Sequence, residues 1–552
     1  MYYPFWRIAL LTLFLTSLSP VLAGQPFVKI GWDTNPEVRV SGYNVYRSIG
    51  TEARVLLNEK ELIGETHFVD RTVKKGTTYT YVVTAIDDQG LESTFSSPLT
   101  VKVEVKHLPA EQTFFLPASV AADQPAFQGI SVGLGLLNLG TMPELVSLTG
   151  IDNQGAQTGY QTVADMGPLA KASVLPDQVA QLRVSSPALL GRSNSDIHSF
   201  FLAGTKDFRA FEVITEKLQP SITQYFPISL SKTGTASLTL FNPDEKKAAE
   251  VELAARTLDG ATVSTKMLVL PPLGSFQGVL AEIFGPDLAL EEGYIAAFSN
   301  QPIEGFQMSA FDSDSLSALP GGRIFRGQRL SLPHFFFDAW GGDTEVRVIN
   351  ADKTEVQLEL KAYLDGQAPP EIRTLTLAPR AQAVVSMRTL LREAFPGAVS
   401  GDLELTAKGR DGAEAIYGKV VAQATFTGNG GRARAIAPLR AQAAETWIFP
   451  DVLQQGDTGF CTGLALLNQR NGPLPLTVRA FDDHGQLVAE RLVEVPAGDR
   501  LVGQLDTDVF FGSGFALIGG HLEVSGDVSF MAIAFLLDQS VEFLSHIGPV
   551  TR

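Results

Sequence analysis

The hexapeptide GLGLLN at residues 133–138 returns almost unchanged as GLALLN at residues 463–468. Two related stretches, SLTLFN and VRVIN, lie between them, and all four close on an asparagine: Asn138, Asn242, Asn350 and Asn468. An asparagine side chain can bond its own backbone two residues on and tolerates left-handed φ, so it ends a strand and begins a turn. We therefore expect four equivalent strands, one in each of four copies of a domain.

Further landmarks surround each asparagine in the same order. Apolar residues ending in a proline precede it, at Pro117, Pro227, Pro333 and Pro450. An acidic turn with glycine follows it after 17, 18, 16 and 17 residues, at Gly155, Gly260, Gly366 and Gly485. A second proline comes next, at Pro168, Pro272, Pro379 and Pro496. Aliphatic stretches follow these prolines, and two of them, VLAEIF and LLREAF, have the apolar spacing of one or two helical turns.

The spacing of the copies indicates their architecture. Successive asparagines are 104, 108 and 118 residues apart. This is too long for a solenoid repeat and suits a complete sandwich of about 100 residues. The sequence thus predicts an all-β chain with four tandem β-sandwich repeats at 112–222, 223–330, 331–441 and 445–552. We expect each copy to hold its own apolar interior, with the copies following one another in a row.

The first residues predict export. Residues 1–23 carry one positive charge at Arg7, an apolar run from Ile8 to Leu18, and small or apolar residues before a cut after Ala23. This is the pattern of a secretory signal peptide. The run is about 11 residues long, whereas a membrane span needs about 20. We expect a secreted or periplasmic protein with no membrane span.

Residues 26–106 differ in character from the four copies. In TYTYVVTAID, residues 78–87, side chains alternate between two faces, which is typical of a strand. Turn formers such as DTNP and DDQG separate such runs and predict a small antiparallel sandwich.

This segment resembles the fibronectin type III domain. The resemblance rests on Trp32 in IGWD, Tyr43 and Val45 in GYNVYR, VKKGTTY ending at Tyr79, and GLES at 90–93. It implies an immunoglobulin-like sandwich in which Trp32 fills the core and the Tyr79 hydroxyl ties back to the backbone. It also implies an extracellular spacer or interaction module. Lys75 stands where the family usually has proline, and the first strand is nearly missing. The Arg-Gly-Asp tripeptide of some adhesive members is absent from the DDQGLES loop.

Charge and cysteine content narrow the possible partners. The formal net charge is −17, with 60 acidic and 43 basic residues and no basic stripe. Binding to nucleic acid or anionic lipid requires clustered Lys and Arg, so we expect neither. Cys461 is the single cysteine, which rules out an intrachain disulfide, and we expect it to be a small buried apolar residue.

A search for catalytic or metal-binding patterns gives only weak candidates. The histidines, at 67, 107, 198, 334, 484, 521 and 546, never pair at zinc-ligand spacing, and no nucleophile-elbow or phosphate-loop motif occurs. His484 with Asp482 and Asp483 falls in a predicted turn. Fragments of calcium loops occur at Asp312 with Asp314 and at Asp506 with Asp508, without the glycine and glutamate of a complete loop. Trp340, in LPHFFFDAWGGD, could stack on a sugar or pack beneath a strand.

These observations favour one function over two others. We expect a non-enzymatic exported modular protein with an interaction, adhesion or scaffold role and no catalytic, cofactor-binding or metal-binding residues. Its partner would be a protein or glycan surface of unknown identity. The second hypothesis is a carbohydrate-binding or accessory protein of an extracellular hydrolase system. The third is a hydrolase whose site is assembled from distant carboxylates.

Overall fold

The computed structural model describes the chain from Val28 to Thr551, and the expected signal peptide lies outside these residues. Within that range the description excludes 33–39, 51, 59–61, 64–66, 71, 75–76, 88–90, 104–112, 118–129, 141–142, 175–180, 186–196, 206–210, 215–219, 231–233, 287, 289, 312–314, 323, 327–328, 366–368, 398, 410–417, 432, 456–458 and 539–543. Strands dominate the described part, so the predicted all-β class is confirmed.

The N-terminal unit consists of two small antiparallel sheets. One pairs β1 (Val28–Gly31) with β4 (His67–Asp70), and the other has the order β3 (Val55–Leu56), β2 (Val40–Ile49), β5 (Thr78–Asp87), β6 (Leu99–Lys102). The Tyr79 hydroxyl accepts a hydrogen bond from the Lys74 backbone N–H at 2.9 Å, which is the backbone tie expected of that side chain. Trp32 is half-buried, with its ring 5.3 Å from that of Tyr43. The fibronectin type III assignment stays a prediction.

The four copies share two strand orders. We call the sheet that contains the strand after the acidic turn the rim sheet, and the sheet that contains the landmark asparagine strand the hub sheet. The rim sheet of the first copy has the order β10 (Gln157–Met166), β9 (Glu144–Ile151), β12 (Gln181–Ser185), β7 (Thr113–Pro117), and that of the second has the order β18 (Thr262–Leu270), β17 (Ala249–Arg256), β20 (Glu292–Phe311), β15 (Ser221–Ser229). The rim sheet of the third copy has the order β26 (Glu371–Leu377), β25 (Val356–Leu364), β28 (Val399–Gly409), β23 (Leu330–Phe337). That of the fourth has the order β35 (Leu487–Val495), β34 (Leu474–Phe481), β38 (His521–Asp538), β31 (Ala444–Phe449).

The hub sheets repeat a second order. In the first copy the order is β11 (Lys171–Val174), β8 (Ile130–Asn138), β13 (Ile197–Thr205), β14 (Phe211–Ile214), and in the second it is β19 (Ser275–Val279), β16 (Thr235–Phe241), β20, β21 (Ser315–Pro320). In the third copy the order is β27 (Gln382–Ser386), β24 (Asp343–Asn350), β29 (Lys419–Gly428), β30 (Ala433–Pro438). In the fourth it is β36 (Arg500–Gln504), β33 (Phe460–Leu467), β38, β39 (Leu544–Ile547). The long strands β20 and β38 serve both sheets of their copies. The remaining strands are β22 (Phe325–Arg326), β32 (Leu453–Gln454), β37 (Leu517–Ile518) and β40 (Val550–Thr551).

Short helices lie near two of the predicted positions. The helix α2 (Leu280–Phe284) matches the VLAEIF stretch, while α3 (Met387–Leu391) begins before LLREAF and covers only its first two residues. Two 3-10 turns, η2 (Ala339–Gly341) and η3 (Asn429–Gly431), complete the regular structure of the described residues.

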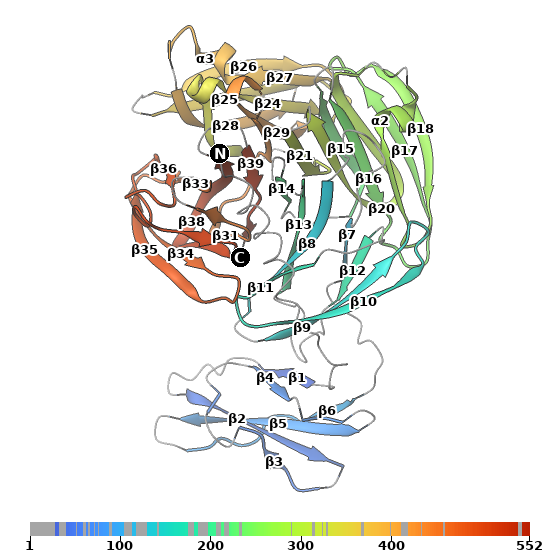
Figure 1. The fold of residues 1–552 in the computed structure, drawn as a ribbon, viewed down its shortest axis with the longest axis vertical. Helices are drawn as coiled ribbons and strands as arrows, with labels where there is room; N and C mark the ends of the chain where they lie inside the picture. The colour runs from blue at the N-terminus through green and yellow to red at the C-terminus, as the bar shows by residue number, and fades with distance from the viewer. Residues whose placement is uncertain are drawn as a thin grey trace, which may run out of the picture.

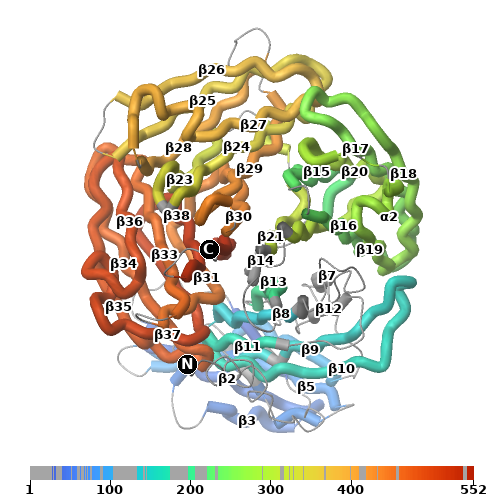
Figure 2. The backbone as a smooth tube through the Cα atoms, turned by 45° about the horizontal axis from the view of Figure 1, so that its top comes forward, coloured from blue at the N-terminus to red at the C-terminus, as the bar shows by residue number. Residues whose placement is uncertain are grey.

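The four copies form a closed ring, which differs from the predicted row (Figures 1 and 2). The last hub strands contact one another in sequence, from β14 to β21, β30, β39 and back to β14. The closing contact includes a parallel pairing of Val213 with Ile547, so the first and fourth copies share one 12-stranded sheet. The row was expected because sequence spacing carries no information on how consecutive copies turn relative to one another.

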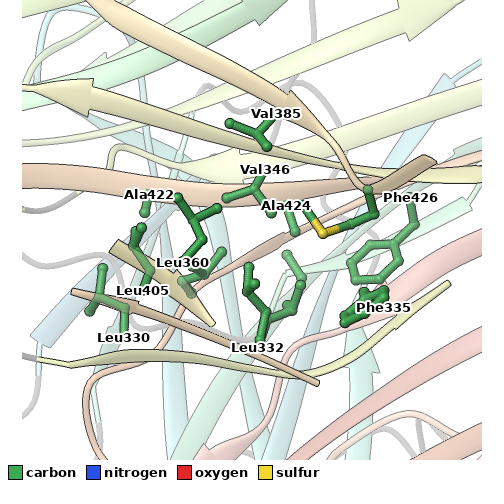
Figure 3. Close-up of a cluster of buried hydrophobic side chains, with 14 of the residues drawn as sticks. Leu330, Leu332, Phe335, Val346, Leu360, Val385, Leu405, Ala422, Ala424 and Phe426 are labelled. Atoms are coloured by element: carbon green, nitrogen blue, oxygen red, sulfur yellow. The ribbon is translucent and has the colours of Figure 1, made fainter. Parts of the chain in front are cut away.

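Apolar clusters cross from copy to copy, contrary to the expectation of self-contained interiors. The cluster of the third copy, shown in Figure 3, also contains Cys461, Ala465 and Phe535 of the fourth copy. The Phe426 and Phe535 rings are 4.7 Å apart across this boundary. Similar clusters join the fourth copy to the first and the first to the second. A hub sheet has two faces, and burying both requires a neighbouring copy on the second face.

Each landmark asparagine has the same bonds in its copy. The Oδ1 atom accepts the backbone N–H two residues on, as expected, at 2.9, 3.1, 2.8 and 3.0 Å for Asn138, Asn242, Asn350 and Asn468. The Nδ2 atom donates to two successive carbonyls about 28 residues on, at the second landmark proline or its equivalent. The asparagine therefore clamps two turns of the copy together.

Candidate functional site

The acidic turn of each copy meets the turn after the second proline of the next copy, and we call this meeting a joint. Gly485 has a φ of +79°, and a Cβ there would lie 2.3 Å from the Pro168 carbonyl oxygen. Gly155 and Gly260 also have positive φ, and a Cβ there would overlap the carbonyl oxygen of Pro272 and of Arg380, respectively. These glycines are therefore required by the contact as well as by their backbone conformation.

Three joints share a backbone hydrogen bond. The N–H of the first residue of β11, β19 or β27 donates to a carbonyl in the acidic turn of the preceding copy. The pairs are Lys171 to Asp483 at 2.9 Å, Ser275 to Asn153 at 3.1 Å and Gln382 to Leu258 at 2.7 Å. The equivalent residue of β36 is Arg500, which reaches the third copy through its side chain. The repeated geometry places these four residues in equivalent positions, and the side chains of Lys171, Ser275 and Arg500 bond the preceding copy.

The joint between the fourth and first copies buries a lysine. The Lys171 side chain is 2% exposed, and its Nζ lies 2.6 Å from Asp451 Oδ1 and 3.1 Å from Asp483 Oδ1. Burial alone would lower the pKa of Lys171, but the charges of Asp451 and Asp483 outweigh it and raise that pKa. The lysine stays charged and links the two ends of the ring.

The joint between the third and fourth copies has the densest polar network. The Arg500 side chain is 2% exposed, and its Nη2 donates to Asp365 Oδ1 at 2.5 Å. Its Nη1 lies 2.6 Å from both His334 Nδ1 and the Gly401 carbonyl oxygen. Burial and the Arg500 charge lower the pKa of His334 to about 3, so the imidazole is neutral and Nδ1 accepts the bond.

A buried carboxyl group lies beside this network. Asp402 of β28 is 7% exposed, and no described residue forms a hydrogen bond with its side chain. Burial raises the pKa of Asp402 to about 7, assisted by the charges of Asp365 and Glu404 and opposed by Arg500. A buried group that titrates near neutrality is often a catalytic acid or base, and structural ion networks shift pKa values in the same way.

The joint between the second and third copies combines buried polar contacts with a small apolar cluster. Arg347 is 1% exposed, and its guanidinium donates to Glu292 at 2.6 Å and to Ser229 at 2.9 Å, both in the second copy. The Tyr294 hydroxyl donates to the Arg380 carbonyl at 2.6 Å. The apolar cluster here is small, with Tyr225, Tyr294 and Ala296 facing Ile349 and Val421.

The sequence candidates do not come together as a site. His484 is exposed in its turn, where its N–H donates to Asp482, while the neighbouring Asp483 belongs to the joint. Asp506 and Asp508 lie in a turn after β36. Trp340 lies in η2 and its side chain is not described, and Asp312 and Asp314 are outside the described residues. Within the described part, no group of three His, Cys, Asp or Glu residues is placed to hold a metal.

Cys461 is buried as predicted. It is 2% exposed, and burial raises the pKa of its thiol to about 12, so it carries no reactive thiolate.

The joint cations Lys171, Arg347 and Arg500 were missed by sequence reasoning. The available signal was a single basic residue inside or at the start of an apolar strand, as in VRVIN around Arg347. A buried charge at such a place requires a partner, but the sequence does not indicate which copy supplies it.

An open hollow of about 620 Å³ lies on the fourth copy. It is lined by the loop after Asn468 and by the middle of β38, including Arg470, Asn471, Pro473, Asp527 and Val528. These residues are mostly exposed and combine hydrogen-bonding groups with apolar surface, so a ligand here would lie on an open face and not in an enclosed pocket. The described residues include no helix long and apolar enough to span a membrane.

Comparisons with known proteins identify no family. No family model and no curated protein matches the chain. Similar solved structures include the M60 catalytic domain with two CBM51 domains from Clostridium perfringens ZmpB, at 10% identity, 72% coverage of this chain and a TM-score of 0.13. Two α-L-rhamnosidases, from Dictyoglumus thermophilum and Streptomyces avermitilis, match at 8% and 9% identity over 88% and 93% of this chain, with TM-scores of 0.13 and 0.11.

The chain spans only about half the length of these proteins, at 53%, 43% and 54%. TM-scores this low carry no argument about the fold or the activity of this chain.

Proposed function

We propose that this chain is a non-enzymatic protein that acts outside the cytoplasmic membrane as a rigid interaction scaffold. The observation that supports the proposal is where the buried charged groups lie. Lys171, Arg347 and Arg500 all bond to acidic residues across joints. Groups that serve a catalytic site must face substrate. Here the three cations instead form ion pairs between neighbouring copies.

The test exposes the chain without its first 23 residues to arrays of glycans and of surface proteins, and then recovers any bound ligand. We expect saturable binding, with a ligand whose mass is unchanged after prolonged incubation. A ligand recovered cleaved or transferred, in amounts that grow with time and protein concentration, would contradict the non-enzymatic proposal.

Carbohydrate binding is the second candidate, favoured by the hollow on the fourth copy. Arg470, Asn471 and Asp527 could bond sugar hydroxyls while Pro473 and Val528 contact a ring face. We expect Arg470→Ala and Asp527→Ala each to weaken glycan binding about tenfold or more, the equivalent of roughly 1.4 kcal/mol. Lys353→Ala, in the corresponding exposed loop of the third copy, is the control. Equal binding by all three variants would rule out this hollow as the glycan site.

A further inference from the structure

The second copy has polar residues at an interior place where the other copies are apolar. Two positions on the strand paired with the landmark strand define this place in each copy. The first is paired with the residue four positions before the landmark asparagine. The second lies two residues further along the same strand. In the second copy these are Gln307 and Ser309. The equivalent pairs are Phe201 with Ala203, Ala424 with Phe426, and Ala534 with Leu536. All six of those side chains belong to buried apolar clusters.

These polar residues surround a small cavity at the joint with the third copy. It is lined by Gln307, Ser309 and Ser317 of the second copy and by Gln423 of the third, with Phe226 and Ile436 among its apolar walls. The cavity volume is about 10 Å³. A cavity needs about 10 to 15 Å³ on this measure to hold a water molecule, so this one has room for a single water.

The hydrogen bonds around the cavity are incomplete. Gln307 Nε2 donates to Ser309 Oγ at 2.8 Å, which leaves the Ser309 hydroxyl hydrogen and Gln307 Oε1 available for further bonds. Ser317 is 1% exposed, and its hydroxyl has no hydrogen-bond partner among the described residues. Gln423 is 6% exposed and brings an amide from the third copy. A buried hydroxyl without a partner is costly, whereas a water with two to four polar neighbours relieves that cost.

We propose that this cavity binds one structural water molecule, which bridges Ser317 of the second copy and Gln423 of the third. The water accepts the Ser317 hydroxyl hydrogen and donates to the side-chain oxygens of Gln307 and Gln423. This bridge suits the joint with the smallest crossing apolar cluster, where polar contacts such as that of Arg347 with Glu292 already join the copies. The polar exceptions in the second copy thus serve the joint.

A high-resolution crystal structure of the whole chain without its first 23 residues tests the proposal directly. We expect one density peak within hydrogen-bond distance of Ser317 Oγ and of the Gln423 amide. A cavity without density, or a Ser317 hydroxyl bonded directly to a protein group, would overturn the proposal.

Two variants give an independent readout. Gln307→Ala with Ser309→Leu installs the residues of the fourth copy, and we expect it to expel the water and to lower Tm, because the buried Ser317 hydroxyl then loses its partner. Ser317→Ala alone removes one partner of the retained water and is expected to lower Tm by about 1 to 2 °C in a ring that unfolds as one unit. Ser264→Ala, a serine of the edge strand β18 outside the cavity, is the control. If Ser317→Ala leaves Tm equal to that of the control, the bridge is not formed through Ser317.

Discussion

Each landmark asparagine uses its whole amide on the backbone of its own copy. Asn350 is fully buried, and its Nδ2 donates to the carbonyls of Thr354, Leu377 and Ala378 while Oδ1 accepts the Asp352 N–H. No other side chain of similar size offers two donors and an acceptor in this arrangement. A single residue therefore fixes the end of β24 against the turn that precedes β27.

We expect Asn350→Ala to lower the free energy of unfolding by about 2 to 4 kcal/mol, because several buried carbonyls and one N–H lose their partner at once. Urea denaturation followed by circular dichroism measures the change. Asn471→Ala, at an exposed asparagine, should change stability by less than about 0.5 kcal/mol. Equal effects in the two variants would show that the clamp does not stabilise the copy.

Asp402 gives a prediction about pH. Its folded pKa of about 7 lies above the unfolded value of about 3.8, so the folded state holds the proton more tightly. The free energy of unfolding should therefore fall as pH rises from about 4 to about 7, and level off above, by roughly 4 kcal/mol at most. In Asp402→Asn this contribution is absent, so the wild type should lose stability relative to the variant over that interval. Parallel stability curves of the two proteins from pH 4 to pH 8 would contradict the assignment.

Predictability from sequence differed between these residues for a physical reason. The backbone bond of the landmark asparagine two residues on is local, and burial of Cys461 follows from its apolar neighbours, so both could be predicted. The second bond of Asn350 spans 28 residues, and that of Arg500 to Asp365 spans 135. Such contacts depend on how sheets stack, which residue type and spacing do not encode. For the same reason the joints could not be found among the sequence candidates.

At the scale of elements, the acidic turn has two roles. It reverses the chain within one copy and packs against the next copy. Its glycine therefore meets a backbone requirement and a packing requirement. Gly485, with its φ of +79°, illustrates this against Pro168. The strand pattern around such turns was predictable because alternation and turn residues are local signals. The packing role was not, since the neighbour belongs to another copy.

Gly485→Ala should therefore cost more than an alanine at an equally left-handed glycine in open space. Gly514 is that control, with a φ of +95° and no atom within 4 Å of a Cβ placed there. Both variants incur backbone strain of about 1 kcal/mol or more, and only Gly485→Ala must also displace the Pro168 carbonyl. Thermal unfolding of the two variants compares the costs. If their Tm values fall equally, the turn does not bear on the next copy.

At the scale of the whole molecule, the ring closes where the first and fourth copies meet, and these two copies are not consecutive in the chain. Here Lys171 lies between Asp451 and Asp483, and the apolar cluster of the fourth copy takes in Leu137, Leu139, Phe200 and Leu202 of the first. Every copy thus has two neighbours.

We expect Lys171→Met to reduce stability by about 3 to 5 kcal/mol, because it leaves Asp451 buried without a counter-charge. Hydrogen exchange should show faster exchange in β14 and β39, which meet at the closure. Arg373→Met removes a half-exposed ion pair with Glu371 of the same strand and should cost no more than about 1 kcal/mol. Unchanged exchange in β14 and β39 would mean that the lysine does not hold the ring closed.

Removal of the fourth copy distinguishes a ring from a row. A chain ending at residue 441 would expose the faces of the first and third copies that the fourth now covers, including Leu137 and Phe200. We expect this shortened chain to aggregate or to unfold with a broad transition, as large exposed apolar patches predict. If the remaining copies instead unfold with the Tm of the full chain, then the crossing clusters contribute little and the copies are independent after all.

Closure also constrains how such a gene can change. In an open solenoid, unequal recombination can add or remove a unit, because each new unit needs only the neighbour beside it. In this chain the fourth copy must pack against the first copy at Lys171. The gain or loss of one copy therefore leaves two packing faces without partners. Lineages of this protein should therefore vary by substitution within copies, as at Gln307 and Ser309, while keeping their number at four.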